Sequence, residues 1–320
     1  MSPRAAPPRP VADPAPRVRA LDRPPPGDFA LLVIGICAVS TSAPLIRAAA
    51  APAFAISFWR NAMASGLLVP YSLLRHRAEL LGLTARDKRL ALIAGALLAA
   101  HFATWIPSLS FTSVASSTAL VATQPVWAAL IARYHGDTIP RLGWTGIWLS
   151  VLGAALLTGI DLHFTPRALV GDLLALVGGW FAAAYVTVGA EIRRTVSTTV
   201  YTTVCYATTS LLLLVLLLVT RTTFTGFSGE TWLAIVGLTL GAQLLGHSVF
   251  NRVLRTTSAT VVSIGILFEI VGAVVLAALF LDEQPRLLAL PAGLLIVGGV
   301  VCVIRAGARQ PAVAGVPAVE

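Results

Sequence analysis

Residues 259–281 read ATVVSIGILFEIVGAVVLAALFL, an uninterrupted apolar stretch of 23 residues in which Glu269 is the only charged side chain. About 20 residues of α-helix cross the hydrocarbon core of a bilayer, which is about 30 Å thick. Backbone polar groups in lipid must be hydrogen-bonded within the segment, so a span of this composition has to be helical. This stretch therefore predicts a transmembrane helix with a single acid near its centre.

The same pattern recurs along the chain. Ten apolar segments of 18 to 23 residues follow one another, and the alternating strands of a membrane barrel, each about 10 residues long, do not occur. The segments are Phe29–Ile46, Ala53–Leu74, Leu90–Leu109, Val114–Ile131, Leu142–Ile160, Leu169–Ala190, Thr199–Thr220, Trp232–Leu254, Ala259–Leu281 and Leu287–Ile304. The sequence thus predicts an all-α polytopic membrane protein with ten transmembrane helices.

The overall composition agrees with this fold class. Of 320 residues, 57% are hydrophobic and only 12% are charged, whereas a soluble domain carries about 25% charged residues. Such a chain cannot cover a water-soluble surface, which argues against a soluble enzyme, a coiled coil and a disordered protein. The net charge of +9 does not indicate a nucleic-acid partner, because the basic residues lie in tails and short loops between apolar segments.

The distribution of basic residues predicts the orientation, because cytoplasmic loops of membrane proteins are enriched in arginine and lysine. With the N-terminus inside, the cytoplasmic segments hold 18 of these residues and the outer segments hold 4. We therefore expect a multi-pass protein of the inner, cytoplasmic membrane with both termini in the cytoplasm. Residues 1–27, which are basic and proline-rich, and residues 306–320 are expected to be disordered tails.

The two halves of the chain align at a shift of 145 residues. The polar matches after the fourth and ninth segments are Asp137 with Asp282, Pro140 with Pro285, and Arg141 with Arg286. Each half, residues 28–160 and 169–305, holds five segments, and this odd number inverts the second half in the membrane. Inverted repeats that move around a midplane site are typical of secondary transporters. The alternative is a duplication kept only for stability.

Three stretches carry a resemblance to a known family: Phe58 to Ala64 (FWRNAMA), Ser113 to Pro125, and Glu269 to Glu283. Together with the ten segments and the repeat, they resemble the EamA family of the drug/metabolite transporter superfamily, over nearly the whole chain apart from the tails. Ile270 stands where the family usually has proline, and the first segment lacks the common Trp-Gly pair. The resemblance implies movement of small metabolites across the inner membrane.

Glu269 and Gln124 are the first candidate site residues. Each is the eleventh residue of its segment, so the repeat makes them equivalent and places both near the midplane. An ionisable group at this depth costs about 2.5 kcal/mol or more, which makes it a functional candidate. We expect Glu269 to take up and release a proton at a substrate site. A structural acid that ties helices together is the alternative.

Two further polar stripes lie on segments that the repeat makes equivalent. His101 and Trp105 share one face of the third segment, and Gln243, His247 and Asn251 follow at four-residue spacing on the eighth. Residues four apart lie on the same face of a helix. We expect both stripes to face a central space, although satisfied core residues would give the same pattern.

Apart from Arg252 near the end of the eighth segment, Arg60 is the only arginine or lysine inside a segment. Three interpretations remain open for its side chain. It can snorkel outward to the membrane surface, it can pair with Glu269, or it can bind an anionic group of a substrate.

Two other patterns concern packing. Pro125 lies mid-segment and removes a backbone hydrogen bond, which predicts a kink or a hinge. Gly146, Ser150 and Gly153 form a stripe of small residues, which predicts close approach of a neighbouring helix.

These features together predict a secondary transporter of small metabolites or drug-like molecules that works by alternating access, with proton coupling as a further expectation. The alternatives are a transport-incompetent scaffold or sensor and an intramembrane enzyme, for which His101 and Glu269 would be the acid–base pair. The expected partners are the bilayer, a small molecule and protons, and the chain is expected as a monomer or homodimer. No cofactor is indicated, and the absence of HxxxH or Cys–His spacing argues against a metal.

Overall fold

The computed structural model describes residues 24–108, 111–112, 117, 120–158, 165–280 and 289–308. The predicted tails lie almost wholly outside this part of the chain, as do the repeat residues Asp282, Pro285 and Arg286. Within the described residues every regular element is a helix and none is a strand, which confirms the all-α prediction.

The helices are α1 (Pro26–Ser40), α2 (Ser42–Ala48), α3 (Ala53–Arg75), α4 (Arg77–Leu81), α5 (Ala85–Ser108), α7 (Gln124–Tyr134), α8 (Arg141–Thr158), α9 (Pro166–Ile192), α10 (Thr198–Thr220), α11 (Gly229–Leu238), the π-helix η1 (Thr239–His247), α12 (Ser248–Val253), α13 (Ala259–Ile266), α14 (Phe268–Phe280) and α15 (Ala289–Ala308). Four stretches are long and apolar enough to cross a membrane: α5, α9, α10 and the continuous run Gly229–Val253. Shorter apolar helices include α1 and the run Ala259–Gly272, which continues from α13 into α14.

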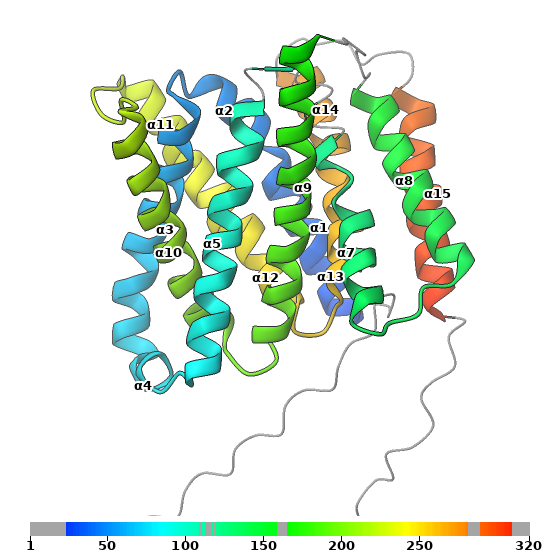
Figure 1. Ribbon diagram of the computed structural model, residues 1–320, viewed down its shortest axis with the longest axis horizontal. Helices are drawn as coiled ribbons and strands as arrows, with labels where there is room; N and C mark the ends of the chain where they lie inside the picture. The colour runs from blue at the N-terminus through cyan, green and yellow to red at the C-terminus, as the bar shows by residue number, and fades with distance from the viewer. Residues whose placement is uncertain are drawn as a thin grey trace, which may run out of the picture.

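The helices stand side by side in one layered bundle (Figure 1). The pair α8 and α15 lies at one end, and α3, α10 and α11 lie at the other. The first residues of α1 and the last residues of α15 lie at the same edge, the lower edge of the figure, where α4 also lies. The two ends of the described chain therefore emerge on one side of the bundle.

Helix pairing joins the two halves of the sequence. The most extensive pairs are α8 with α15, α5 with α9, α3 with α10, α5 with α10, α1 with η1, α7 with α9, α1 with α14, and α7 with α13. Every one of these pairs takes one helix from before residue 159 and one from after residue 164. The largest buried cluster, which includes Phe102, Tyr201 and Tyr206, draws its helical residues from α1, α3, α5, α9, α10, α12 and α13. Separate clusters hold the buried residues of α7, α8 and α15. The halves therefore interleave throughout the bundle.

The pair α8 and α15 is packed through small residues. A methyl group added to Gly146 would lie 2.5 Å from the carbonyl oxygen of Gly299, and one added to Gly153 would lie 2.7 Å from that of Ala292. The Ser150 hydroxyl donates to the carbonyl oxygen of Ile296 at 3.3 Å. The prediction of close approach along this stripe is confirmed.

Several predicted segments are not continuous α-helices. The first is divided at Thr41 between α1 and α2, and the eighth contains the π-helix η1. In the fourth, Pro125 lies in the first turn of α7, where a backbone N–H has no helical partner to lose. Residues 120–121 are also helical and residues 122–123 form a turn, so the predicted kink is present directly before the proline, which lies at the start of α7.

Candidate functional site

The fourth predicted segment is interrupted at a tight turn. The amide of Thr123 donates to the carbonyl oxygen of Leu120 at 3.1 Å, and that of Val126 donates to Thr123 at 2.9 Å. Bonds that span three residues instead of four tighten the backbone and redirect the chain. Gln124 follows this turn as the first residue of α7, with Pro125 after it.

The ninth segment is interrupted at the equivalent place. The amide of Leu267 donates to Ile264 at 3.2 Å, and that of Ile270 donates to Leu267 at 3.2 Å. Glu269 lies in the first turn of α14, directly after this break. The break forms even though residue 270 is isoleucine. Each half therefore places one polar residue next to an interrupted helix, which is how binding sites of secondary transporters are commonly built.

Arg60 turns into the bundle. Its side chain is 3% exposed, its Nε donates to Oε1 of Gln243 at 2.8 Å, and its guanidinium lies 5.2 Å from the centre of the Phe102 ring. Nε2 of Gln243 donates in turn to Oδ1 of Asn61 at 3.1 Å, and Nδ2 of Asn61 donates to the carbonyl oxygen of Ser57 at 2.8 Å. Outward snorkelling, the first of the three interpretations, is therefore wrong.

Arg60 and Glu269 each have a polar atom that forms no hydrogen bond with the described residues. The Nη2 atom of Arg60 is buried and has no hydrogen-bond partner among the described residues. Glu269 is half-buried and, within the described part of the chain, accepts no hydrogen bond and forms no ion pair. The two charges still interact electrostatically across the space between them. Each group therefore keeps a hydrogen-bonding position that no described residue fills.

His101 and Trp105 form one wall of this region. A hydrogen bond of 2.9 Å joins Nδ1 of His101 to the carbonyl oxygen of Gly178, so the neutral ring carries its proton on Nδ1 and offers Nε2 as an acceptor. The ring stacks on Trp105, with centroids 5.5 Å apart. The Nε1 atom of Trp105 is buried without a partner in the described residues. His101 also interacts electrostatically with Arg60.

The π-helix divides the predicted stripe on the eighth segment. Gln243 lies in η1 and faces Arg60, and His247, half-buried at the end of η1, also interacts electrostatically with that arginine. Asn251 faces elsewhere: its Oδ1 accepts from the Tyr185 hydroxyl at 3.0 Å. Gln243 and His247 are therefore brought to Arg60, whereas Asn251 ties α12 to α9.

Gln124 does not contact Glu269, its partner in the repeat. Its Nε2 donates to the hydroxyl of Ser263 at 3.0 Å, and its side chain is 7% exposed. This bond joins α7 to α13, so the fourth and ninth segments do meet near their breaks. The residue that makes the contact is Ser263, which the repeat pattern gives no reason to select.

Sequence reasoning also missed the conformation that carries the site. The π-helix follows Leu238 without any proline or unusual composition to signal it. Such wide helical turns are rare and are frequently found at functional sites. The cation–ring contact with Phe102 was likewise hidden, because an aromatic residue in an apolar segment reads as core.

Comparison with known proteins identifies the family to which this architecture belongs. Residues 25–159 and residues 169–305 each match the EamA-like transporter family. An uncharacterized transporter of Archaeoglobus fulgidus is 23% identical over 196 residues, which are 60% of this chain and 68% of that protein. One solved crystal structure superposes with a TM-score of 0.75 at 18% identity, covers 88% of this chain and 98% of its own, and shows the shared fold. The chain is thus a multi-pass membrane protein that belongs to the EamA-like transporter family.

Proposed function

We propose that this protein is a secondary transporter that moves a small metabolite or drug-like molecule across the cytoplasmic membrane by alternating access. The observation that carries the proposal is the pair of unused groups at the centre, Nη2 of Arg60 and the Glu269 carboxyl, beside two interrupted helices. A buried arginine with an unbonded nitrogen is costly unless a ligand completes it. Membership of a transporter family agrees with this interpretation.

The proposal includes ten transmembrane helices arranged as two inverted repeats, residues 28–160 and 169–305. Exchange of the two halves converts the pair α5–α9, the third and sixth segments, into the pair η1–α1, the eighth and first. The pairs α3–α10, α7–α13 and α8–α15 are each converted into themselves. Contacts that survive this exchange support a two-fold pseudosymmetry axis in the membrane plane, as inverted repeats require.

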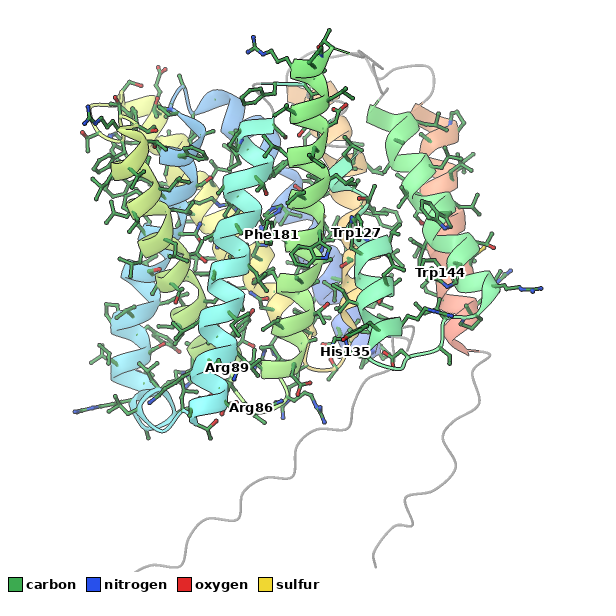
Figure 2. All side chains as sticks on the ribbon, in the orientation of Figure 1. Arg86, Arg89, Trp127, His135, Trp144 and Phe181 are labelled. Atoms are coloured by element: carbon green, nitrogen blue, oxygen red, sulfur yellow. The ribbon has the colours of Figure 1, made fainter. Side chains whose placement is uncertain are left out.

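The proposed orientation places both termini in the cytoplasm. Arg86, Arg89 and His135 lie at the lower edge of the bundle (Figure 2), the same edge from which α1 and α15 reach the ends of the described chain. The basic loops and the chain ends therefore share one side. Basic loops are retained on the cytoplasmic side of membrane proteins.

The central residues are assigned as follows. Arg60 binds an anionic group of the substrate, and the stacked rings of His101 and Trp105 provide an aromatic wall that contacts its apolar part. Glu269 carries the coupled proton, because it is an acid without a permanent partner among the described residues. Gln243 holds Arg60 in place through the bond to Nε.

Transport is tested with the purified full-length chain. Thermal-shift screening against amino acids, nucleosides and cationic dyes selects a compound that stabilises the protein, and counterflow of that compound is then measured in proteoliposomes. We expect counterflow by the wild type, its loss in Arg60→Leu, and its retention in Arg305→Leu, which removes an exposed arginine of α15. A stabilising compound that shows no counterflow would favour the scaffold or sensor instead. Conversion of that compound into a product would favour the enzyme.

A further inference from the structure

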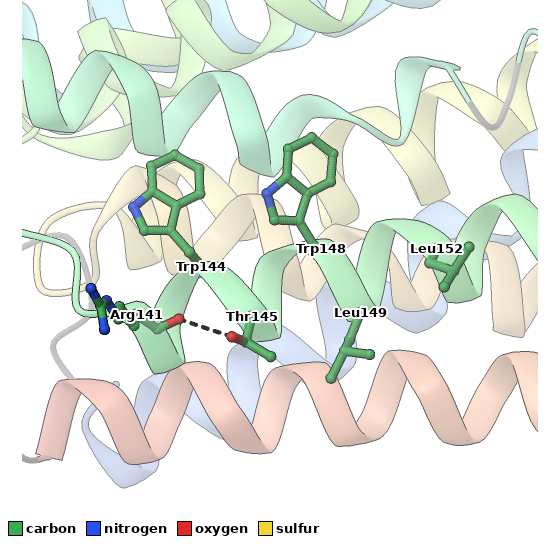
Figure 3. Close-up of a pocket in the computed structure, with 6 residues that line it drawn as sticks. All are labelled: Arg141, Trp144, Thr145, Trp148, Leu149 and Leu152. Carbon is green, nitrogen blue, oxygen red and sulfur yellow. Dashed lines mark hydrogen bonds between the residues drawn. The ribbon is translucent and has the colours of Figure 1, made fainter.

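The outer face of α8 carries a shallow groove that is separate from the central site. Its volume is about 550 Å³. The lining residues are Arg141, Trp144, Thr145, Trp148, Leu149 and Leu152 (Figure 3). The other faces of α8 are occupied, because Gly146 and Gly153 contact α15 and Ile147 packs in a buried cluster with α7. The groove therefore opens away from the bundle, where Trp148 is 56% exposed.

One end of the groove offers hydrogen-bond donors. Arg141 is exposed and forms no ion pair within the described part of the chain. The indole nitrogens of Trp144 and Trp148 both lie on the side of their rings nearer Arg141 (Figure 3), and neither is bonded to another described residue. Arg141 and Trp148 lie two helical turns apart, about 10 Å along the axis.

The other end of the groove is apolar. Leu149 and Leu152 continue the groove away from Arg141 toward the middle of α8, and Leu152 is 51% exposed. Polarity thus falls from a guanidinium, through two indoles, to aliphatic side chains. A phospholipid has the same order of groups, from phosphate through ester carbonyls to acyl chain, and tryptophan is favoured at the level of the headgroups.

The fold itself does not require this surface. At the shift of 145 residues, Trp144 corresponds to Ala289 and Trp148 corresponds to Gly293 on α15. The equivalent helix of the second half therefore lacks both indoles, although the two helices pack against each other through the same small-residue contact. Trp144 packs partly against the buried cluster that contains Ile147, whereas the exposed Trp148 needs an explanation other than packing.

We propose that this groove binds an anionic phospholipid of the cytoplasmic leaflet, with its phosphate on Arg141 and one acyl chain along Trp148 and Leu152. The Arg141 end of α8 faces the edge that carries the basic loops, and the cytoplasmic leaflet is the anionic one. The positive charge of Arg141 complements the lipid phosphate, and the chain contributes no acidic partner for it in the described residues. This inference rests on the proposed orientation and is independent of the central site.

Tryptophan quenching by brominated lipids tests the inference on the full-length chain. The protein is reconstituted in phosphatidylcholine vesicles that contain a minority of phosphatidylglycerol, with bromine on the acyl chains of one lipid or the other. The part of the quenching that the double variant Trp144→Phe with Trp148→Phe removes should be about fivefold larger per mole fraction with brominated phosphatidylglycerol than with brominated phosphatidylcholine, because one arginine beside an anionic surface contributes on this order. Equal quenching by the two lipids would overturn the inference.

Matched variants test whether the excess quenching by phosphatidylglycerol arises at this groove. Arg141→Gln should abolish the excess quenching, and the double variant Trp144→Phe with Trp148→Phe should abolish it independently, whereas Arg305→Gln at the same edge should keep it. An excess that survives Arg141→Gln or the double variant would place the lipid elsewhere and reject the groove. Efficient cross-linking of Trp148→Cys to a second copy in the same vesicles would show that a protein covers this face, and would also reject it. Counterflow is not the readout, so these outcomes leave the transport proposal unaffected.

Discussion

Gln124 and Glu269 occupy equivalent places in the two halves, each in the first turn after an interrupted helix, yet their surroundings differ. The amide of Gln124 donates to Ser263 and fastens one half to the other. The carboxyl of Glu269 has no such bond among the described residues and interacts with Arg60 only through space. The interrupted helix is thus common to both halves, whereas the unpaired charge belongs to one.

The different surroundings of Gln124 and Glu269 suggest different roles for the two residues, one in stability and one in function. A neutral amide at membrane depth is satisfied by one hydroxyl, so Gln124 is explained by the contact between α7 and α13. A carboxyl at the same depth costs about 2.5 kcal/mol or more, and no described hydrogen bond offsets that cost. Stability therefore does not account for Glu269, which agrees with its proposed role in transport.

The variant with the largest expected effect removes the difference between Gln124 and Glu269. Glu269→Gln makes the two breaks alike and removes the only carboxyl group among the candidate site residues. We expect accumulation driven by a pH gradient to fall to the level of empty liposomes, while exchange at equal concentrations on both sides persists. The measurement is uptake of the compound found by thermal-shift screening, with and without the gradient. Unchanged pH-dependent uptake at normal expression would return Glu269 to a structural role.

The next variant removes the hydrogen bond of Gln124. Ser263→Ala leaves the buried amide of Gln124 without its acceptor, and an unsatisfied buried donor costs about 1 to 3 kcal/mol. The melting temperature should fall, whereas proton coupling should be unchanged. Ser263→Thr keeps the hydroxyl and serves as the control. A loss of coupling in Ser263→Ala without a loss of stability would show that both halves take part in proton transfer.

The smallest effect concerns an acid that does have partners, Glu191 at the end of α9. Partial burial raises the pKa of Glu191, but hydrogen bonds from Arg86 and Arg194 outweigh it and hold this pKa below its ordinary value. The contribution to stability is therefore present above the ordinary value and is lost as the pH falls through the lowered pKa. Because Glu191 is partly exposed, we expect less than about 1 kcal/mol.

Melting temperatures measured against pH check this expectation. Glu191→Gln should lower the melting temperature slightly at neutral pH and should flatten its decline toward acid pH. Glu230→Gln, which alters an exposed acid in the first turn of α11, is the control and should change neither quantity. A wild-type curve that coincides with that of Glu191→Gln over the whole range would show that the ion pairs contribute nothing.

The sequence predicted the equivalence of Gln124 and Glu269 better than the direction of their side chains. The repeat pairs the two residues, and each lies in the first turn after a helix break. The direction of a side chain depends on the rotation of its helix about the helix axis. Helix breaks and the π-helix change this rotation, and no sequence signal marks them. For this reason the turn of Arg60 toward Gln243 and the partner of Gln124 could not be predicted. Pro125 did indicate the kink in the fourth segment, but the apolar sequence around it did not show that α7 begins at Gln124.

The interleaving of the halves also has a consequence for synthesis. The Ser150 hydroxyl and its acceptor on Ile296 are separated by 146 residues of chain, so α8 leaves the ribosome long before the surface that completes it exists. Proteins usually fold one domain after another as they are made, but here the first half has no finished form of its own. The glycine-lined face of α8 has no helix to pack against until α15 has been made. A chain released before α15 would remain unassembled, and cellular quality control would act on the whole molecule as a single unit.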